Sequence, residues 1–122
     1  MLATLARLTD DPDEAAAWLE EGEAIATGPC LSFNRLWFRE NAIEHALSVG
    51  DSAAVRHHAD AIEAFVAPEP FPWATLVVDR ARALADGDAA ALAVVLERMR
   101  ETGLMLGPGF NAEARRIGRA PR

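Results

Sequence analysis

The sequence predicts an all-α protein that is built as a row of antiparallel helix pairs. Its most frequent residue types are Ala, Leu, Arg and Glu, which are strong helix formers, and it contains no Lys. The apolar residues recur with the 3.6-residue period of a helix rather than the two-residue period of a strand. Gly and Pro residues then divide most of the chain into six segments of helical length.

Length and charge limit the classes of function. A chain of 122 residues suits one small domain, and a hydrophobic content of 51% supports a packed core. The net charge of −7 opposes a nucleic-acid-binding surface, because such a surface needs a basic patch. The lone Cys30 excludes a disulfide framework and a cysteine-based zinc site. We find neither an export signal nor an apolar run of roughly 20 residues that could span a bilayer, so we expect a cytoplasmic protein with no membrane contact.

The first two predicted helices are residues 1–9 and residues 12–26. Asp11 is the expected N-cap of the second helix, and Glu14 completes a capping box. Gly28 begins the Gly-Pro pair that ends this helix. The residues expected to face inward are Ala15, Trp18, Leu19, Gly22 and Ile25.

The third and fourth predicted helices are residues 33–49 and residues 52–66. Ser32 is the expected N-cap of the third helix, and Asp51 that of the fourth. Gly50 can close the third helix because it has no Cβ to clash in the left-handed conformation. The expected apolar stripes are Phe33, Leu36, Trp37, Ile43 and Leu47, then Val55, His58, Ala59, Ile62, Phe65 and Val66.

The fifth and sixth predicted helices are residues 72–86 and residues 89–102. A Pro-rich segment precedes the fifth helix, and Gly87 and Asp88 separate it from the sixth. Gly103 ends the sixth helix. The residues expected to be buried are Trp73, Leu76, Val77 and Leu84 in the fifth helix, and Leu92, Val95, Leu96 and Met99 in the sixth.

An internal repeat connects the last four predicted helices. The pairs Gly50-Asp51 and Gly87-Asp88 lie 37 residues apart, and Ala46-Leu47 aligns with Ala83-Leu84 at the same offset. Each unit is a helix, a Gly-Asp turn and a second helix. One such hairpin cannot bury its apolar face alone, so about three hairpins must share a continuous core. Six helices provide that number.

Three segments carry a resemblance to a known family, namely Ala17–Glu23, Leu36–Arg39 and Pro68–Trp73. Together with the repeat, they resemble a divergent tetratricopeptide-repeat (TPR) array. More narrowly, they are similar to the C-terminal helical-repeat region of some bacterial adenylate/guanylate cyclases. The resemblance covers roughly residues 10–103 and implies a TPR-like α-α superhelix of about three antiparallel helix pairs. It supplies no catalytic residue, because the cyclase domain has no counterpart in this chain.

The chain accordingly divides into a TPR-like helical repeat domain, residues 1–103, and a C-terminal tail, residues 104–122. We expect the tail to be partly mobile, with one short helix possible over Asn111–Ile117. From Gly103 to the end the chain carries four Arg and a single acidic residue, so the acidic excess belongs to the helical domain.

The TPR resemblance implies binding of a protein or peptide rather than catalysis. We therefore predict a non-enzymatic interaction or regulatory module with a protein partner and no cofactor. Glu40 stands where the peptide-carboxylate clamp of some TPR domains has a cation, so we do not predict such a clamp. Phe38 is the expected aromatic hot spot of an exposed face. The predicted partner-binding residues are Asn34, Trp37, Phe38, Asn41, Val77 and Arg80.

Two alternatives to partner binding are open. The first is a small-molecule-sensing domain, with a pocket between the third and fifth helices lined by Trp37, Asn41, Val77 and Arg80. The second is an enzyme that uses Glu44, His45 and Asp79 for acid/base chemistry. A homodimer is also expected, since a terminal helix pair without a polar cap would be covered by two-fold pairing.

The remaining polar residues are expected to be structural. Neighbouring histidines on one helix point about 100° apart, so His57 and His58 do not predict a metal site. We expect His58 to be half-buried, and His45 and His57 to lie at the surface. The acids Glu40, Glu44 and Asp79 are expected to form ion pairs between adjacent helices.

Overall fold

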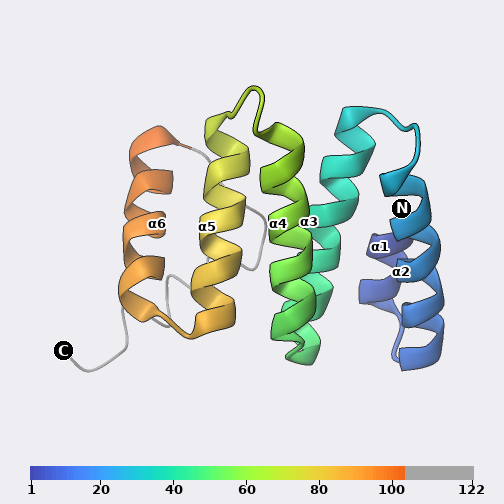
Figure 1. Ribbon diagram of the computed structural model, residues 1–122. Coiled ribbons are helices and arrows are strands. Elements are labelled where there is room, and N and C mark those ends of the chain that lie inside the picture. Colours follow the sequence, from blue (N-terminus) through green and yellow to red (C-terminus); the bar gives the residue numbers. More distant parts are fainter. Residues whose placement is uncertain (104–122) are drawn as a thin grey trace.

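The computed structural model describes residues 1–103, and within them it contains six α-helices and no strand (Figure 1). The all-α class is thus confirmed, and each helix begins and ends within one residue of its predicted bounds. The tail, including the short helix expected in it, lies outside the described residues. The helices are α1 (Leu2–Leu8), α2 (Pro12–Thr27), α3 (Ser32–Val49), α4 (Ser52–Val66), α5 (Pro72–Asp86) and α6 (Ala89–Thr102).

The helices form a row in which each one packs against the next along the chain (Figure 1). The odd-numbered helices also touch one another, since α3 contacts both α1 and α5. Within the described residues, the even-numbered helices make no such contacts among themselves. The helix α3 therefore has the most neighbours, namely α1, α2, α4 and α5.

The two Gly-Asp turns have the same geometry. Gly50 and Gly87 adopt left-handed conformations with φ of 74° and 65°. In both turns the glycine N–H donates to the carbonyl three residues back at 3.3 Å, and the Asp N–H donates to the carbonyl five residues back at 2.9 Å. The carboxylates of Asp51 and Asp88 then accept from the N–H three residues on, at 3.0 and 2.9 Å. The repeat read from the sequence is therefore a repeat of local structure at these turns.

The start of α2 differs from the predicted capping box. Asp11 caps the helix as expected and accepts from the N–H groups of Asp13 and Glu14, at 2.9 and 3.4 Å. In a capping box the Glu14 carboxylate would accept from the N–H of Asp11. Here the Thr9 hydroxyl accepts from that N–H instead, at 3.2 Å, and donates to Glu14 at 2.7 Å. Ser32 is also not an N-cap, because it is the first helical residue of α3.

The core is divided into one large cluster and two small ones. The large cluster joins α3, α4, α5 and α6. The buried faces predicted for α4 and α6 are confirmed apart from Phe65, which is half-buried, and Leu92 and Leu96 of α6 pack against Ala83 of α5 in the first small cluster. The second small cluster joins α1, α2 and α3, and its buried members are three alanines and one aromatic residue. These are Ala3, Ala26, Ala42 and Phe38.

The predicted apolar stripe of α3 is wrong in part. Phe33 and Trp37 are 65% and 49% exposed, whereas Phe38 and the polar residues Arg39 and Asn41 are buried. The reason is that α3 contacts four other helices, so more than one side of it is buried. The buried sides include Arg39 and Asn41, which a prediction from hydrophobicity places at the surface. In α2, Ile25 is likewise exposed rather than inward.

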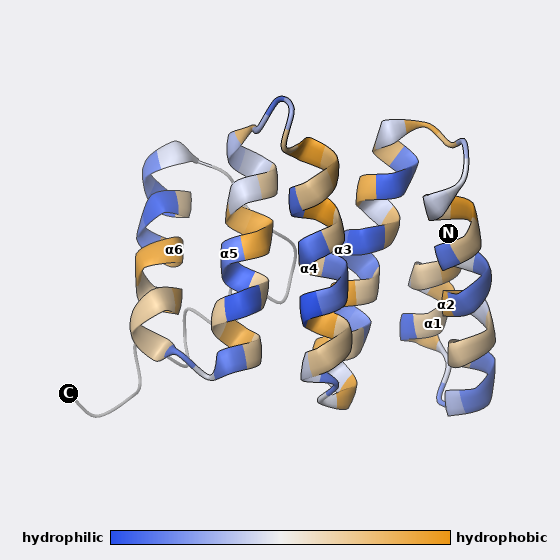
Figure 2. Ribbon diagram, viewed as in Figure 1, coloured by the Kyte–Doolittle hydropathy of each residue, from blue (hydrophilic) through white to orange (hydrophobic). Residues whose placement is uncertain are grey.

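Hydrophilic and hydrophobic residues alternate around every helix (Figure 2). None of the helices in residues 1–103 combines the length and the apolar character that crossing a bilayer requires.

Candidate functional site

The six predicted partner-binding residues do not form one surface. Val77 is 2% exposed in the large core cluster, so it is unavailable to a partner. Phe38 is 8% exposed and packs against α2, so it is not the exposed aromatic that we expected. Both corrections have the same cause: helices on either side of α3 and α5 cover these positions. Of the six residues, Trp37 and Asn34 are exposed.

A stripe of four residues follows one side of α3. We call Phe33, Trp37, Glu40 and Glu44 the α3 stripe; their spacing of four, three and four residues places them on one helix face. Phe33 and Trp37 form an edge-to-face pair with ring centroids 5.1 Å apart. The stripe is therefore aromatic toward the start of α3 and acidic toward its end.

The acidic end of the α3 stripe lies among buried polar groups. Arg80 of α5 is buried and makes an ion pair with Glu44. Arg7 of α1 donates to the side-chain oxygen of Asn41 at 2.8 Å, and the Asn41 amide donates to the Trp37 carbonyl at 3.0 Å. The predicted residues Asn41 and Arg80 thus hold α3 to its two neighbours in the odd-numbered layer.

Glu40 differs from its neighbours because its carboxylate accepts no hydrogen bond from any residue in the range 1–103. It is half-buried, and this burial together with the charge of Glu44 raises the pKa of Glu40 above its ordinary value. The charges of Arg80 and Arg7 act in the opposite direction without reversing the shift.

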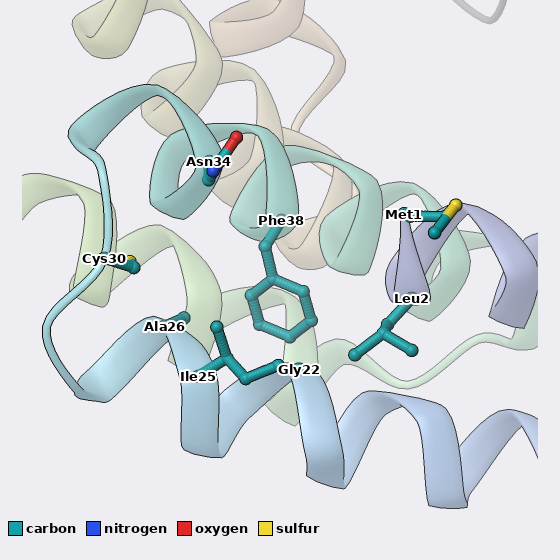
Figure 3. Close-up of a pocket in the computed structure, with 8 residues that line it drawn as sticks. All are labelled: Met1, Leu2, Gly22, Ile25, Ala26, Cys30, Asn34 and Phe38. Atoms are coloured by element: carbon teal, nitrogen blue, oxygen red, sulfur yellow. The ribbon is translucent and has the colours of Figure 1, made fainter.

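A cavity of about 340 Å³ lies between α1, α2 and α3 (Figure 3). The Phe38 ring reaches across it from α3 toward Gly22 of α2, and the Cys30 side chain lies at the other side of the cavity. Among residues 1–103, no charged side chain lines it. The lining residues are Met1, Leu2, Gly22, Ile25, Ala26, Cys30, Asn34 and Phe38.

This cavity is not the pocket that the sequence predicts between the third and fifth helices. None of the four residues expected there lines it, and none lines the second cavity described, which has a volume of about 310 Å³ and lies between α4 and α5. The second cavity contains the carboxylates of Glu63 and Asp79. Each of them is already paired with an arginine, Arg82 and Arg98 respectively.

A buried arginine links three helices beside the first cavity. Arg39 of α3 is 5% exposed; it forms an ion pair with Glu23 of α2 and donates to His58 Nδ1 of α4 at 3.0 Å. Because Nδ1 accepts this bond, His58 carries its proton on Nε2 and is neutral. Burial and the charge of Arg39 lower the pKa of His58 to about 4.

The carboxylate of this network is held ionised. Partial burial acts to raise the pKa of Glu23, but hydrogen bonds from Arg39 and His57 outweigh it and leave the pKa below its ordinary value. The His57 Nε2 atom lies 3.1 Å from the carboxylate. The sequence did not point to Glu23 as a partner, because Glu23 is separated from these residues by 16 to 35 positions and belongs to another helix.

Judged by distance alone, a metal ion could be held by Glu23, His57 and His58, since one ligand atom from each lies within 4.8 Å of the others. However, Arg39 Nη1 is bonded to two of these three residues, Glu23 and His58. The guanidinium therefore stands where a metal cation would have to bind, and like charges oppose such binding. We assign this group to the structure of the protein rather than to a metal site.

The residues of the acid/base alternative are not joined. Glu44 is paired with Arg80, and Asp79 is paired with Arg98 at 2.8 Å. Within the described residues, no hydrogen bond connects the His45 side chain to either carboxylate. These ion pairs bridge adjacent helices, as we expected for Glu44 and Asp79.

Comparisons with protein-family models, with curated proteins and with solved structures return no match for this chain.

Proposed function

We propose that this chain is a TPR-like helical-repeat module that binds a protein partner, and that the α3 stripe receives an apolar and basic segment of that partner. The observation that carries the proposal is the stripe itself, in which an exposed aromatic pair precedes a half-buried carboxylate without a hydrogen-bond partner among the described residues.

The arrangement of the helices supports the repeat part of the proposal. The odd-numbered helices touch one another in sequence, as the first helices of stacked hairpins do. The two Gly-Asp turns share their conformation and their hydrogen bonds. A stack of this kind presents the outer side of one helix layer as a continuous binding surface.

The chemistry of the stripe favours a positively charged partner. A Lys or Arg side chain near Glu40 would satisfy a carboxylate that burial leaves poorly solvated, and it would reduce the repulsion between Glu40 and Glu44. The acidic excess of the whole chain would also attract such a partner before contact. Apolar side chains of the partner would cover Phe33 and Trp37, whose burial supplies most of the expected affinity.

The length of the stripe sets the spacing of the recognised groups. A helix rises 1.5 Å per residue, so Trp37 and Glu44 lie roughly 10 Å apart along α3. An extended peptide spans that length in about three residues. We therefore expect a motif in which an aromatic or aliphatic residue precedes an Arg or Lys by about three positions, or follows it if the peptide runs the other way.

Selection from a displayed library of random 12-residue peptides tests the proposal. We expect the full chain to enrich this motif, and synthetic peptides carrying it to bind with affinities that fall as salt concentration rises. Trp37→Ala and Glu40→Gln should each weaken binding about tenfold or more. The matched controls are Val94→Ala and Glu97→Gln on α6, which change an exposed apolar and an exposed acidic residue away from the stripe. Enrichment of acidic peptides, or equal losses in the controls, would refute the proposal.

A cytoplasmic location and a homodimer stay predictions from the sequence.

A further inference from the structure

The cavity between α1, α2 and α3 is separate from the α3 stripe, since none of the four stripe residues lines it. Its volume of about 340 Å³ is more than twice that of an engineered protein cavity of roughly 150 Å³ that takes up benzene. A molecule with two fused rings fits such a volume better than a single ring.

The lining of the cavity selects against cations. Its side chains are apolar apart from the Asn34 amide and the Cys30 thiol, so a cation would lose its hydration without gaining an ion pair, and the α-amino charge of Met1 would repel it. Asn34 lies on α3 at the edge of the cavity (Figure 3), and its amide, after rotation of the side chain, can form a hydrogen bond with one polar group of a ligand.

The lining also favours aromatic ligands over aliphatic ones. The Phe38 ring can pack against a second ring in an offset or edge-to-face arrangement. Met1 and Cys30, whose side chains contain sulfur, line the same cavity, and sulfur makes favourable contacts with aromatic rings.

From these observations we infer that this cavity binds a small neutral aromatic molecule of two fused rings with one hydrogen-bonding group, the chemistry of an indole or a naphthol. This binding site is independent of the partner-binding surface on α3.

Titration of the full chain with indole and with 2-naphthol, followed by amide NMR spectra, tests the inference. We expect saturable shifts centred on Gly22, Cys30 and Phe38. The cationic analogue 2-naphthylmethylammonium should bind about tenfold more weakly or worse. Saturating indole should also slow the reaction of Cys30, the only cysteine of the chain, with a thiol reagent. Shifts that do not saturate, shifts centred elsewhere, or equal affinity for the cationic analogue would each overturn the inference.

Two changes at Cys30 show whether the cavity itself is the site. Cys30→Phe fills the cavity and should weaken binding about tenfold, whereas Cys30→Ser preserves the space and should change it less than about threefold. If Cys30→Phe does not fold, attachment of phenylmaleimide to the wild-type thiol should have the same effect. Trp37→Ala should leave indole binding unchanged, because Trp37 belongs to the α3 stripe. Undiminished binding by the filled cavity would exclude this site.

Discussion

Gly22 and Phe38 form a contact that a larger residue at position 22 would disrupt. A Cβ built on Gly22 would lie 2.2 Å from Cε2 of the Phe38 ring, far inside van der Waals contact. Gly inside a helix is usually unfavourable by about 0.5–1 kcal/mol relative to Ala, so a Gly at this position calls for a packing reason. Here the reason is that the absent side chain lets the Phe38 ring approach the backbone of α2.

We therefore predict that Gly22→Ala lowers the free energy of unfolding by about 1–3 kcal/mol, because the ring of Phe38 must move. Urea denaturation measures this change. Gly28→Ala is the matched control, since a Cβ on Gly28 would meet backbone atoms only at ordinary contact distances of 3.5 and 3.6 Å. A gain in stability for Gly22→Ala, as at an exposed helical site, would contradict the packing explanation.

His58 makes the stability of the protein depend on pH. Its pKa is about 4 in the folded chain, compared with an ordinary value near 6.5. Well above pH 6.5 it is neutral in both the folded and the unfolded state and has no effect on stability. As pH falls from 6.5 toward 4, the unfolded chain takes up a proton that the folded chain excludes, so the free energy of unfolding falls.

At pH 5 we expect His58 to reduce the free energy of unfolding by about 2 kcal/mol relative to pH 7.5. His58→Asn, whose side-chain oxygen can still accept from Arg39, should remove this part of the pH dependence, and His45→Gln should not. Glu40 acts with the opposite sign, because its raised pKa favours the folded state as pH falls. The test is therefore the difference between wild type and His58→Asn in urea denaturation at each pH. An identical pH profile for the two would refute the prediction.

At the scale of elements, α3 and α5 each end at a glycine in the left-handed backbone conformation. Gly50 and Gly87 both adopt positive φ, and within residues 1–103 no atom beyond the chain neighbours would lie within 4 Å of a Cβ at either position. A substitution there is consequently opposed by backbone strain alone, without any steric clash from packing.

We predict that Gly50→Ala and Gly87→Ala each lower the free energy of unfolding by about 1–2 kcal/mol, the usual cost of a left-handed conformation for a residue with a side chain. The two losses should agree closely, since the turns share their geometry. The corresponding Asn variants should lose less, because Asn tolerates this conformation. Thermal and urea denaturation of the four variants provide the measurement, and clearly unequal losses for the two Ala variants would show that the turns are not equivalent.

At the scale of the whole molecule, Arg39 connects parts of the chain that otherwise share little core. Its contacts with Glu23 and His58 join α2, α3 and α4, next to the small alanine-rich cluster that holds α1 and α2 to the rest. The burial of the guanidinium makes this interaction stronger than an ion pair at the surface.

A double-mutant cycle with Arg39→Met and Glu23→Gln should give a coupling free energy of about 1–3 kcal/mol. The exposed pair of Arg100 and Glu97, one turn apart on α6, is the matched control and should give less than about 0.5 kcal/mol. Equal coupling in the two pairs would mean that burial does not strengthen the contact between α2 and α3.

The sequence by itself determined the class of the fold and, within residues 1–103, the number of helices and their ends. These properties depend on local chemistry: the helix preference of Ala, Leu, Arg and Glu, the caps at Asp11, Asp51 and Asp88, and the glycines that accept positive φ. The buried faces of α4 and α6 were also predictable, because each has a single apolar stripe.

Only the tertiary structure decided which side of α3 is buried. That helix has four neighbours, so Phe38 and Arg39 face inward while Phe33 and Trp37 stay exposed. The sequence did not predict the cavity, nor the network of Glu23, Arg39 and His58, for a related reason. Their residues come from separate helices, and packing between residues far apart in the sequence sets how these helices are aligned. Periodicity describes one helix at a time, whereas a site made by three helices depends on how they are placed against one another.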